Sequence, residues 1–181
     1  WESFTQYMDA LDAMPHSLDF LTLVPHDPVR MAVMGPRAVA GEPATADDIA
    51  AMRALVREAL EAGAVGFSTG RSDNHRTAEG HDTPAAEATE AELTGIARAF
   101  EGLNHGVVQM VSDFDVLRAP GRFDAEFDLV EALARAAGSA KLAFQAGAAG
   151  MLIGLGFFLA FVVLLESVIE KYVRLKLKLY I

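Results

Sequence analysis

The sequence of 181 residues contains no cysteine. This absence excludes disulfide bonds, thiolate metal ligands and thiol catalysis, and it leaves the redox compartment undecided. Lysine is absent from residues 1–140, which hold ten arginines against 23 acidic residues and carry a formal charge of −13. So acidic a segment argues against a nucleic-acid-binding surface, because such surfaces cluster lysine and arginine.

Several motifs of catalytic and cofactor sites are also missing. The sequence has no His-x-His pair, no His-Glu-x-x-His and no Gly-x-x-x-x-Gly-Lys-Ser/Thr phosphate loop. The five histidines are widely spaced and do not compose a metal site by themselves. The residues alone therefore indicate an acidic protein with polar loops and no recognisable metal or phosphate motif.

What is present is an alternation of amphipathic helices with short apolar strands. The expected helices are 1–14, Thr45 to Gly63, Thr89 to Phe100 and Asp124 to Gly138, each with an apolar stripe that we expect to be buried and that includes Leu55 and Phe127. Thr45 with Asp48, and Thr89 with Glu92, predict capping boxes at the starts of the second and third helices. The expected strands are 20–24, 65–67, 107–112 and 142–144. Strands that alternate with helices of this length pair in parallel through right-handed crossovers, so the sequence predicts an α/β fold.

The connections are unequal in length. The loops that follow strands are long (25–44, 69–88 and 113–123), whereas the turns that lead into strands are short. A (β/α) barrel with its working face at the carboxyl ends of the strands shows this asymmetry. We therefore expect a partial TIM-like barrel, with a flavodoxin-like open sheet as the alternative. A full barrel needs about 250 residues, so the barrel interpretation also predicts that the chain is a piece of one.

The first long loop offers two candidate site residues. His26 could ligate a metal, transfer protons or orient a neighbour, and Arg30 could hold a carboxylate. Equally, His26 could cap the strand and Arg30 could form a structural ion pair. The residue types leave both interpretations open.

The later loops carry further polar side chains. Those of the second loop suit either a substrate-covering loop or a solvated turn: Ser68, Arg71, His75, Arg76 and His81. The third loop follows Gln109, Ser112 and Asp113, and a single aspartate at a strand end is a weak signal of a general base. His105 enters its strand from the opposite end, where a barrel has its stabilising face.

Three stretches carry a resemblance to a known family. They are LVPHDPVRMAVMG, EAGAVGFSTGRSDNHRT and GVVQMVSDFD, in that order. Up to about Gln145 the sequence resembles the N-acyl-D-amino-acid deacylase (D-aminoacylase-like) branch of the metal-dependent amidohydrolases. The resemblance implies a TIM-like barrel that hydrolyses the amide of small N-acyl-D-amino acids with metal-activated water, zinc in the parent family, and a cytoplasmic location.

The resemblance carries over no metal ligand. The family's His-x-His pair and cysteine ligand lie before Trp1, and its catalytic aspartate lies beyond the resembling segment. A histidine of the family falls on the strand VVQMVS, where this chain has Gln109 and Met110. No cofactor is therefore expected for this chain alone. The residues that match motif positions are implied to bind substrate: His26, Arg30, His75 and Arg76.

The chain changes character at its C-terminal end. Ala146 to Leu165 is twenty residues without a charge, long enough for a membrane-seeking helix, and a basic segment follows. We therefore expect a partial barrel over 1–145 and a hydrophobic helix over 146–181. The tail is a membrane anchor, a helix buried against a partner, or foreign sequence joined to the barrel.

Two function classes follow. The first is an amidohydrolase fragment, inactive alone, which begins inside a longer protein because Trp1 is not an initiator methionine. The second is a non-enzymatic membrane-anchored or binding module, or a chimeric product. In either case unpaired strand edges predict self-association.

Overall fold

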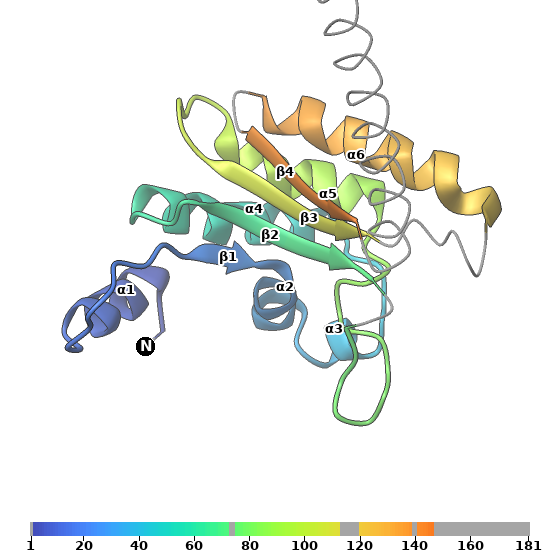
Figure 1. The fold of residues 1–181 in the computed structure, drawn as a ribbon. Coiled ribbons are helices and arrows are strands. Elements are labelled where there is room, and N and C mark those ends of the chain that lie inside the picture. The colour runs from blue at the N-terminus through green and yellow to red at the C-terminus, as the bar shows by residue number, and fades with distance from the viewer. Residues whose placement is uncertain (1, 73–74, 113–119, 139–140, 147–181) are drawn as a thin grey trace, which may run out of the picture.

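Helices and strands alternate along the chain and place four parallel strands in one sheet (Figure 1). The structure is a computed structural model that describes residues 2–72, 75–112, 120–138 and 141–146. The strands are β1 (Leu23–Pro25), β2 (Gly66–Arg71), β3 (Val107–Ser112) and β4 (Lys141–Ala146). Their pairing is parallel throughout, so the predicted α/β class with a parallel sheet is confirmed.

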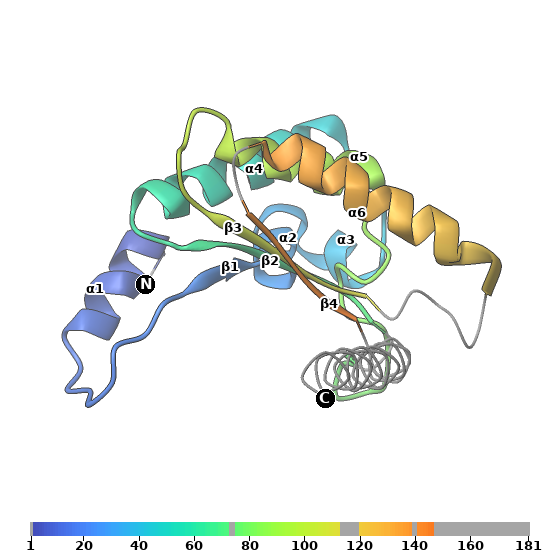
Figure 2. The same ribbon diagram turned by 45° about the horizontal axis from the view of Figure 1, so that its top comes forward.

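Three long helices lie along the same side of this sheet (Figure 2). They are α4 (Ala46–Glu61), α5 (Glu90–Ala97, continued by the 3-10 turn Arg98–Phe100) and α6 (Phe123–Ala137). The shorter helices are α1 (Phe4–Asp12), α2 (His26–Met34) and α3 (Pro36–Val39). Helix α2 contacts α4, and α3 contacts α2, whereas α1 lies beyond the amino-terminal end of β1 and also contacts α4 (Figures 1 and 2).

The strand order is the same as the order along the chain, β1-β2-β3-β4. A doubly wound sheet of the flavodoxin type reverses direction and carries helices on both faces. The described sheet shows neither feature: every strand pairs with its successor, and the helices cover one face. Within these residues the flavodoxin-like alternative is therefore wrong.

The core lies between the sheet and the three long helices. Burial alternates along β3, and in β2 the buried side chains of Phe67 and Thr69 flank the half-buried Ser68, so that every second side chain points into the helical layer. The largest fully buried apolar side chains are Phe67, Phe100, Met52, Leu60, Leu93, Ile96, Met110 and Leu133. Burying one such side chain contributes about 1.5 to 3 kcal/mol, which makes this interface the main source of stability.

The helix starts follow local sequence signals. Thr45 and Asp48 form the predicted capping box at the start of α4, and Thr89 caps α5 through the Glu92 amide. The Arg37 hydrogen bond, followed by the bonds from Thr45, lowers the pKa of Asp48 to about 2. Helix α4 is therefore fixed at its first turn by the groups that the sequence indicated.

Several expectations about these elements are wrong. The segment 25–44 contains α2 and α3, because Val29 and Met34 pack on the core and Gly35, with φ 57°, ends α2. The stripe expected along 1–14 buries none of the α1 residues. Leu55 and Phe127 were placed in the core but are 39% and 55% exposed, since each lies on the outer side of its helix.

The predicted hydrophobic helix lies outside the described residues, apart from its first residue. Ala146 is the last residue of β4, so the strand runs past the expected 142–144 and into the apolar run. Among the described residues no helix is both long and apolar enough to span a bilayer.

Candidate functional site

His26, Arg30 and Glu92 form a buried cluster at the carboxyl end of β1. His26 opens α2 directly after the strand, and Arg30 follows one turn later on the same helix. His26 Nε2 and Arg30 Nε lie 3.0 and 2.8 Å from the same oxygen, Glu92 Oε1 on α5. The three side chains are 1%, 3% and 0% exposed, so the cluster is closed to solvent.

The pKa of Glu92 lies below its ordinary value of 4.5. Burial is the largest influence and raises it, but the hydrogen bonds and charges of His26 and Arg30 together outweigh burial. Glu92 is therefore a carboxylate near neutral pH, and its charge is balanced by Arg30. Its second oxygen, Oε2, is the one buried side-chain polar atom left without a partner among the described residues.

His26 connects this cluster to the sheet. Its Nδ1 lies 3.0 Å from Thr69 Oγ1 in β2, and its ring packs 5.2 Å from that of Phe67. Both contacts are satisfied when Nε2 carries a proton and donates to Glu92, while Nδ1 accepts from the Thr69 hydroxyl. The imidazole is thereby held on both sides and oriented by a carboxylate.

Arg30 ties the surrounding loops together. Beyond Glu92, its terminal nitrogens donate to three carbonyl oxygens, those of Ala38 (3.3 Å), Pro84 (2.6 Å) and Glu42 (2.5 Å). These bonds use four of the five guanidinium N–H groups. Arg30 therefore has little capacity left for a ligand carboxylate in this structure, and the structural ion pair is the interpretation that its contacts favour.

A second buried ion pair lies at the ends of β2 and β3. Arg71 donates to Glu126 of α6 from Nε (2.9 Å) and from a terminal nitrogen (2.7 Å), and Ser112 Oγ lies 3.3 Å from the same carboxylate. Burial raises the pKa of Glu126, but Arg71, Arg122 and Ser112 together bring it below the ordinary value. The pair closes the helical layer beneath the strand ends.

The loop after β2 folds into a short hairpin. Arg76 and Asp82 form an isolated antiparallel bridge and an ion pair, and the Thr77 amide donates to the His81 carbonyl at 2.9 Å. A pocket of about 350 Å³ lies between this hairpin and α3, and Arg30, His81 and Glu87 are among its lining residues. The loop is thus ordered around a polar pocket.

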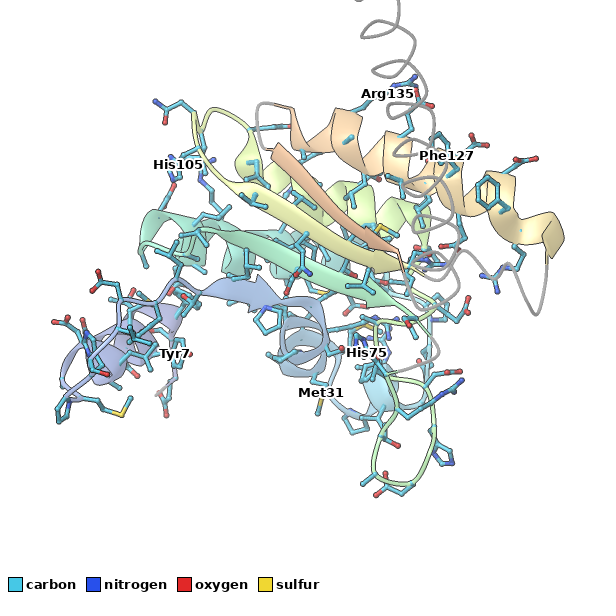
Figure 3. The ribbon with its side chains drawn as sticks, in the orientation of Figure 1. Tyr7, Met31, His75, His105, Phe127 and Arg135 are labelled. Carbon is cyan, nitrogen blue, oxygen red and sulfur yellow. The ribbon has the colours of Figure 1, made fainter. Side chains whose placement is uncertain are left out.

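The four residues predicted to bind substrate fall into two groups. His26 and Arg30 share Glu92, whereas His75 and Arg76 are exposed at the base of the hairpin. Figure 3 shows His75 at the carboxyl end of β2 and His105 at the opposite end of the strands. Substrate binding by these four residues stays a prediction.

Sequence analysis missed Glu92 and Glu126 as members of these clusters. Glu92 occupies the third helical position after Thr89, which predicted a capping box, but its side chain turns inward to His26. The available signal was charge on a buried helix face, since Glu92 directly precedes Leu93 and lies one turn before Ile96.

The described residues do not fit the metal that the resemblance implies. No group of three or more histidine, aspartate or glutamate side chains in the described part of the chain is placed to hold a metal ion. On the strand where the family has a histidine, this chain has Gln109 and Met110, and neither is an imidazole or a carboxylate. We therefore assign no step of metal chemistry to these residues.

Comparison with known proteins confirms the resemblance. No family model matches the sequence. The chain is 39% identical over 98 residues to the D-aminoacylase of Alcaligenes xylosoxydans xylosoxydans and 39% identical over 92 residues to the N-acyl-D-glutamate deacylase of that organism. These matches span 54% and 51% of this chain but only 18% and 16% of the relatives, so they cover less than a fifth of the length of either relative.

Solved structures of D-aminoacylase have a similar fold. One, reported for its binuclear metal center, matches with a TM-score of 0.53 and 24% identity over 80% of this chain and 33% of the other. A second, reported as defining a novel subset of amidohydrolases, matches with a TM-score of 0.51 at the same identity and coverage. At this identity the likeness concerns the fold.

Proposed function

We propose that this chain is part of an amidohydrolase-like (β/α) barrel whose parent hydrolyses the amide bond of N-acyl-D-amino acids. The observation that carries the proposal is the order β1-β2-β3-β4 with helices gathered on one side, the arrangement of successive barrel units. The similarity to N-acyl-D-amino-acid deacylases supports the substrate class.

In this proposal the clusters at the strand ends shape the substrate pocket. The Glu92 carboxylate holds His26 and Arg30, and Arg30 holds the loops around the pocket beside the hairpin. His75 and Arg76 lie at the base of the hairpin that borders this pocket, just after the end of β2. A rigid frame of this kind positions loops that contact ligand.

The same proposal makes the chain inactive alone. Metal dependence belongs to the parent family, zinc being the metal we expect there, and the described residues do not fit a metal. We further propose that 1–145 and 146–181 are separate parts, with the second seeking membrane. The parent location would then be cytoplasmic, or membrane-bound where the tail is native.

Self-association is part of the proposal as well. In the described sheet β1 and β4 each have one strand neighbour, so each leaves an edge with unpaired backbone groups. Open edges of this kind pair with other chains. We expect the chain to form oligomers in dilute buffer, which size-exclusion chromatography with light scattering would reveal.

The activity experiment uses the full chain and a graft. The purified chain with added zinc should release no amino acid from N-acetyl-D-methionine above a metal blank. Its matching residues should then replace the corresponding segment of the Alcaligenes D-aminoacylase. We expect the graft to fold and to show zinc-dependent release of amino acid from N-acetyl-D-methionine, which the isolated chain should lack. A graft that cannot fold, or an active isolated chain, would contradict the proposal.

A further inference from the structure

The face of the sheet that points away from the long helices carries an uncharged polar group. Ser68 in β2 and Gln109 in β3 are register partners, so their side chains lie next to each other on one face. Each alternates with residues that point into the helical layer, Thr69 on one strand and Met110 on the other. Ser68 and Gln109 therefore share the face that points away from the long helices.

His75 returns to this same face. A Cβ atom built on Gly70 would lie 3.2 Å from His75 Nδ1, which places the imidazole directly over Gly70. Gly70 is two residues after Ser68, so it faces the same side about 6.6 Å further along the strand. The absence of a side chain at Gly70 is what admits the ring so close to the backbone.

These three side chains have unused hydrogen-bonding groups. In the part of the chain that the structure describes, none of Ser68 Oγ, the Gln109 amide and the His75 ring has a hydrogen-bond partner. Ser68 and Gln109 are half-buried, whereas His75 is exposed. In β1, β2 and β3 the neighbouring positions on this face are apolar or glycine: Leu23, Pro25, Gly66, Gly70, Val107 and Val111. In β4 the positions in register with Val107, Gln109 and Val111 are Lys141, Ala143 and Gln145.

We propose that Ser68, Gln109 and His75 form a binding subsite for a neutral amide group. A carboxamide both donates and accepts, so Gln109 can either donate to the carbonyl oxygen of a ligand amide or accept from its N–H. The Ser68 hydroxyl and the His75 ring, both on the β2 side of Gln109, supply a further donor or acceptor for the group of the amide that Gln109 leaves unbonded.

The register partners of Gln109 are Ser68 on one side and Ala143 on the other, so no charged position adjoins its amide. Lys141 is the one charged position on this face of the described strands, and it lies beside Val107. An ionic ligand group therefore finds no counterion next to Gln109.

The apolar neighbours define the rest of the ligand. Val107 and Val111 flank Gln109 on β3, and an aliphatic group attached to the amide can lie against them. The subsite thus suits the acyl amide of an N-acylated amino acid whose side chain is apolar. This inference rests on the proposed function, because it assigns the recognition of the substrate's amide to residues of this chain.

The test measures binding, not turnover. The full chain in mild detergent is titrated with N-acetyl-D-leucine methyl ester, which is uncharged and has a single amide, and binding is followed by saturation transfer and by the ring signals of His75. Gln109→Leu and Ser68→Ala should each weaken binding about 2- to 10-fold, the range for one or two hydrogen bonds. Asn104→Ala, an exposed amide off this face, is the matched control and should bind as the parent does.

A second variant guards against misfolding. Gln109→Glu keeps the shape of the side chain but loses both amide donors, so it should also weaken binding while melting like the parent. Absent binding, equal binding by Gln109→Leu, or equal loss in Asn104→Ala would overturn the subsite. None of these results would affect the graft experiment, so failure of the subsite and failure of the proposed function remain distinguishable.

Discussion

Arg71 and Glu126 form a buried two-pronged ion pair across 55 residues of sequence, joining the end of β2 to the first turns of α6. Both side chains are less than a tenth exposed. The pair therefore fixes α6 to β2, the strand one unit earlier than its own strand β3, and it does so at the carboxyl ends of the strands. Removing either partner leaves a buried charge without its counterion.

Glu126→Gln should destabilise the fold strongly. The neutral amide cannot balance Arg71, and breaking a buried pair in this way costs about 3 to 5 kcal/mol. Urea unfolding followed by circular dichroism measures the loss. Glu131→Gln is the matched control, since its pair with Arg135 on the same helix is exposed and contributes little. Equal midpoints for the two variants would show that the pair is unimportant.

Glu92→Gln should loosen the hairpin as well as the helix. Arg30 loses its counterion, and the carbonyl bonds that it makes to residues 38, 42 and 84 weaken with it. We expect faster amide hydrogen exchange over 76–88 and a loss of about 3 kcal/mol or more in unfolding free energy. Exchange unchanged at the hairpin would mean that Arg30 does not hold this loop.

Stability should fall on acidification below the ordinary carboxyl range. The pKa values of Glu92 and Glu126 are lower in the folded chain than their ordinary value of 4.5. Their contribution is complete above pH 4.5 and disappears as pH falls through the lowered values, because the unfolded chain then binds protons more readily. Thermal midpoints between pH 7 and pH 3 measure this dependence.

Glu92→Gln should flatten that pH dependence, whereas Glu79→Gln, at an exposed position of the hairpin, should leave it as it is. A parent chain whose midpoint stays constant down to pH 3 would contradict the lowered values.

Phe67→Ala should lower the free energy of unfolding far more than a matched substitution on the surface. Phe67 is fully buried between sheet and helices, and truncating such a ring costs about 3 to 5 kcal/mol. Phe127→Ala is the control, because that ring is 55% exposed and only stacks on Phe123 with centroids 6.4 Å apart. We expect the control to change stability by less than about 0.5 kcal/mol in the same urea titration. Similar losses would place Phe127 in a core after all.

Local signals predicted the local part of this structure. Strand β3 has the bounds that the sequence indicated, and the Thr45 box starts α4 where it should, since each depends on neighbouring residues. The contact of Glu92 with His26 could not be predicted from local signals, because the two residues are 66 positions apart in the sequence. Its spacing after Thr89 fits a cap equally well, and only the assembled fold decides which partner the carboxylate takes.

The same limit explains the other misassignments. Leu55 and Phe127 fit an apolar helical period, but the width of the buried stripe depends on how far the neighbouring helices extend. For the candidate site, the sequence predicted His26 and Arg30 as a pair. It did not predict that the N–H groups of Arg30 would donate to backbone carbonyl oxygens distant in sequence, or that the His75 ring would lie over Gly70.

The pairing of each strand with its successor also has a consequence for folding. No described strand has to wait for a distant one, so sheet contacts form between units adjacent along the chain, each closing a loop of a few tens of residues. The sheet can grow from its first pair outward as the polypeptide emerges. A register error between β2 and β3 would then carry over to β4. The first two strand pairings therefore decide whether the rest of the sheet forms in the correct register.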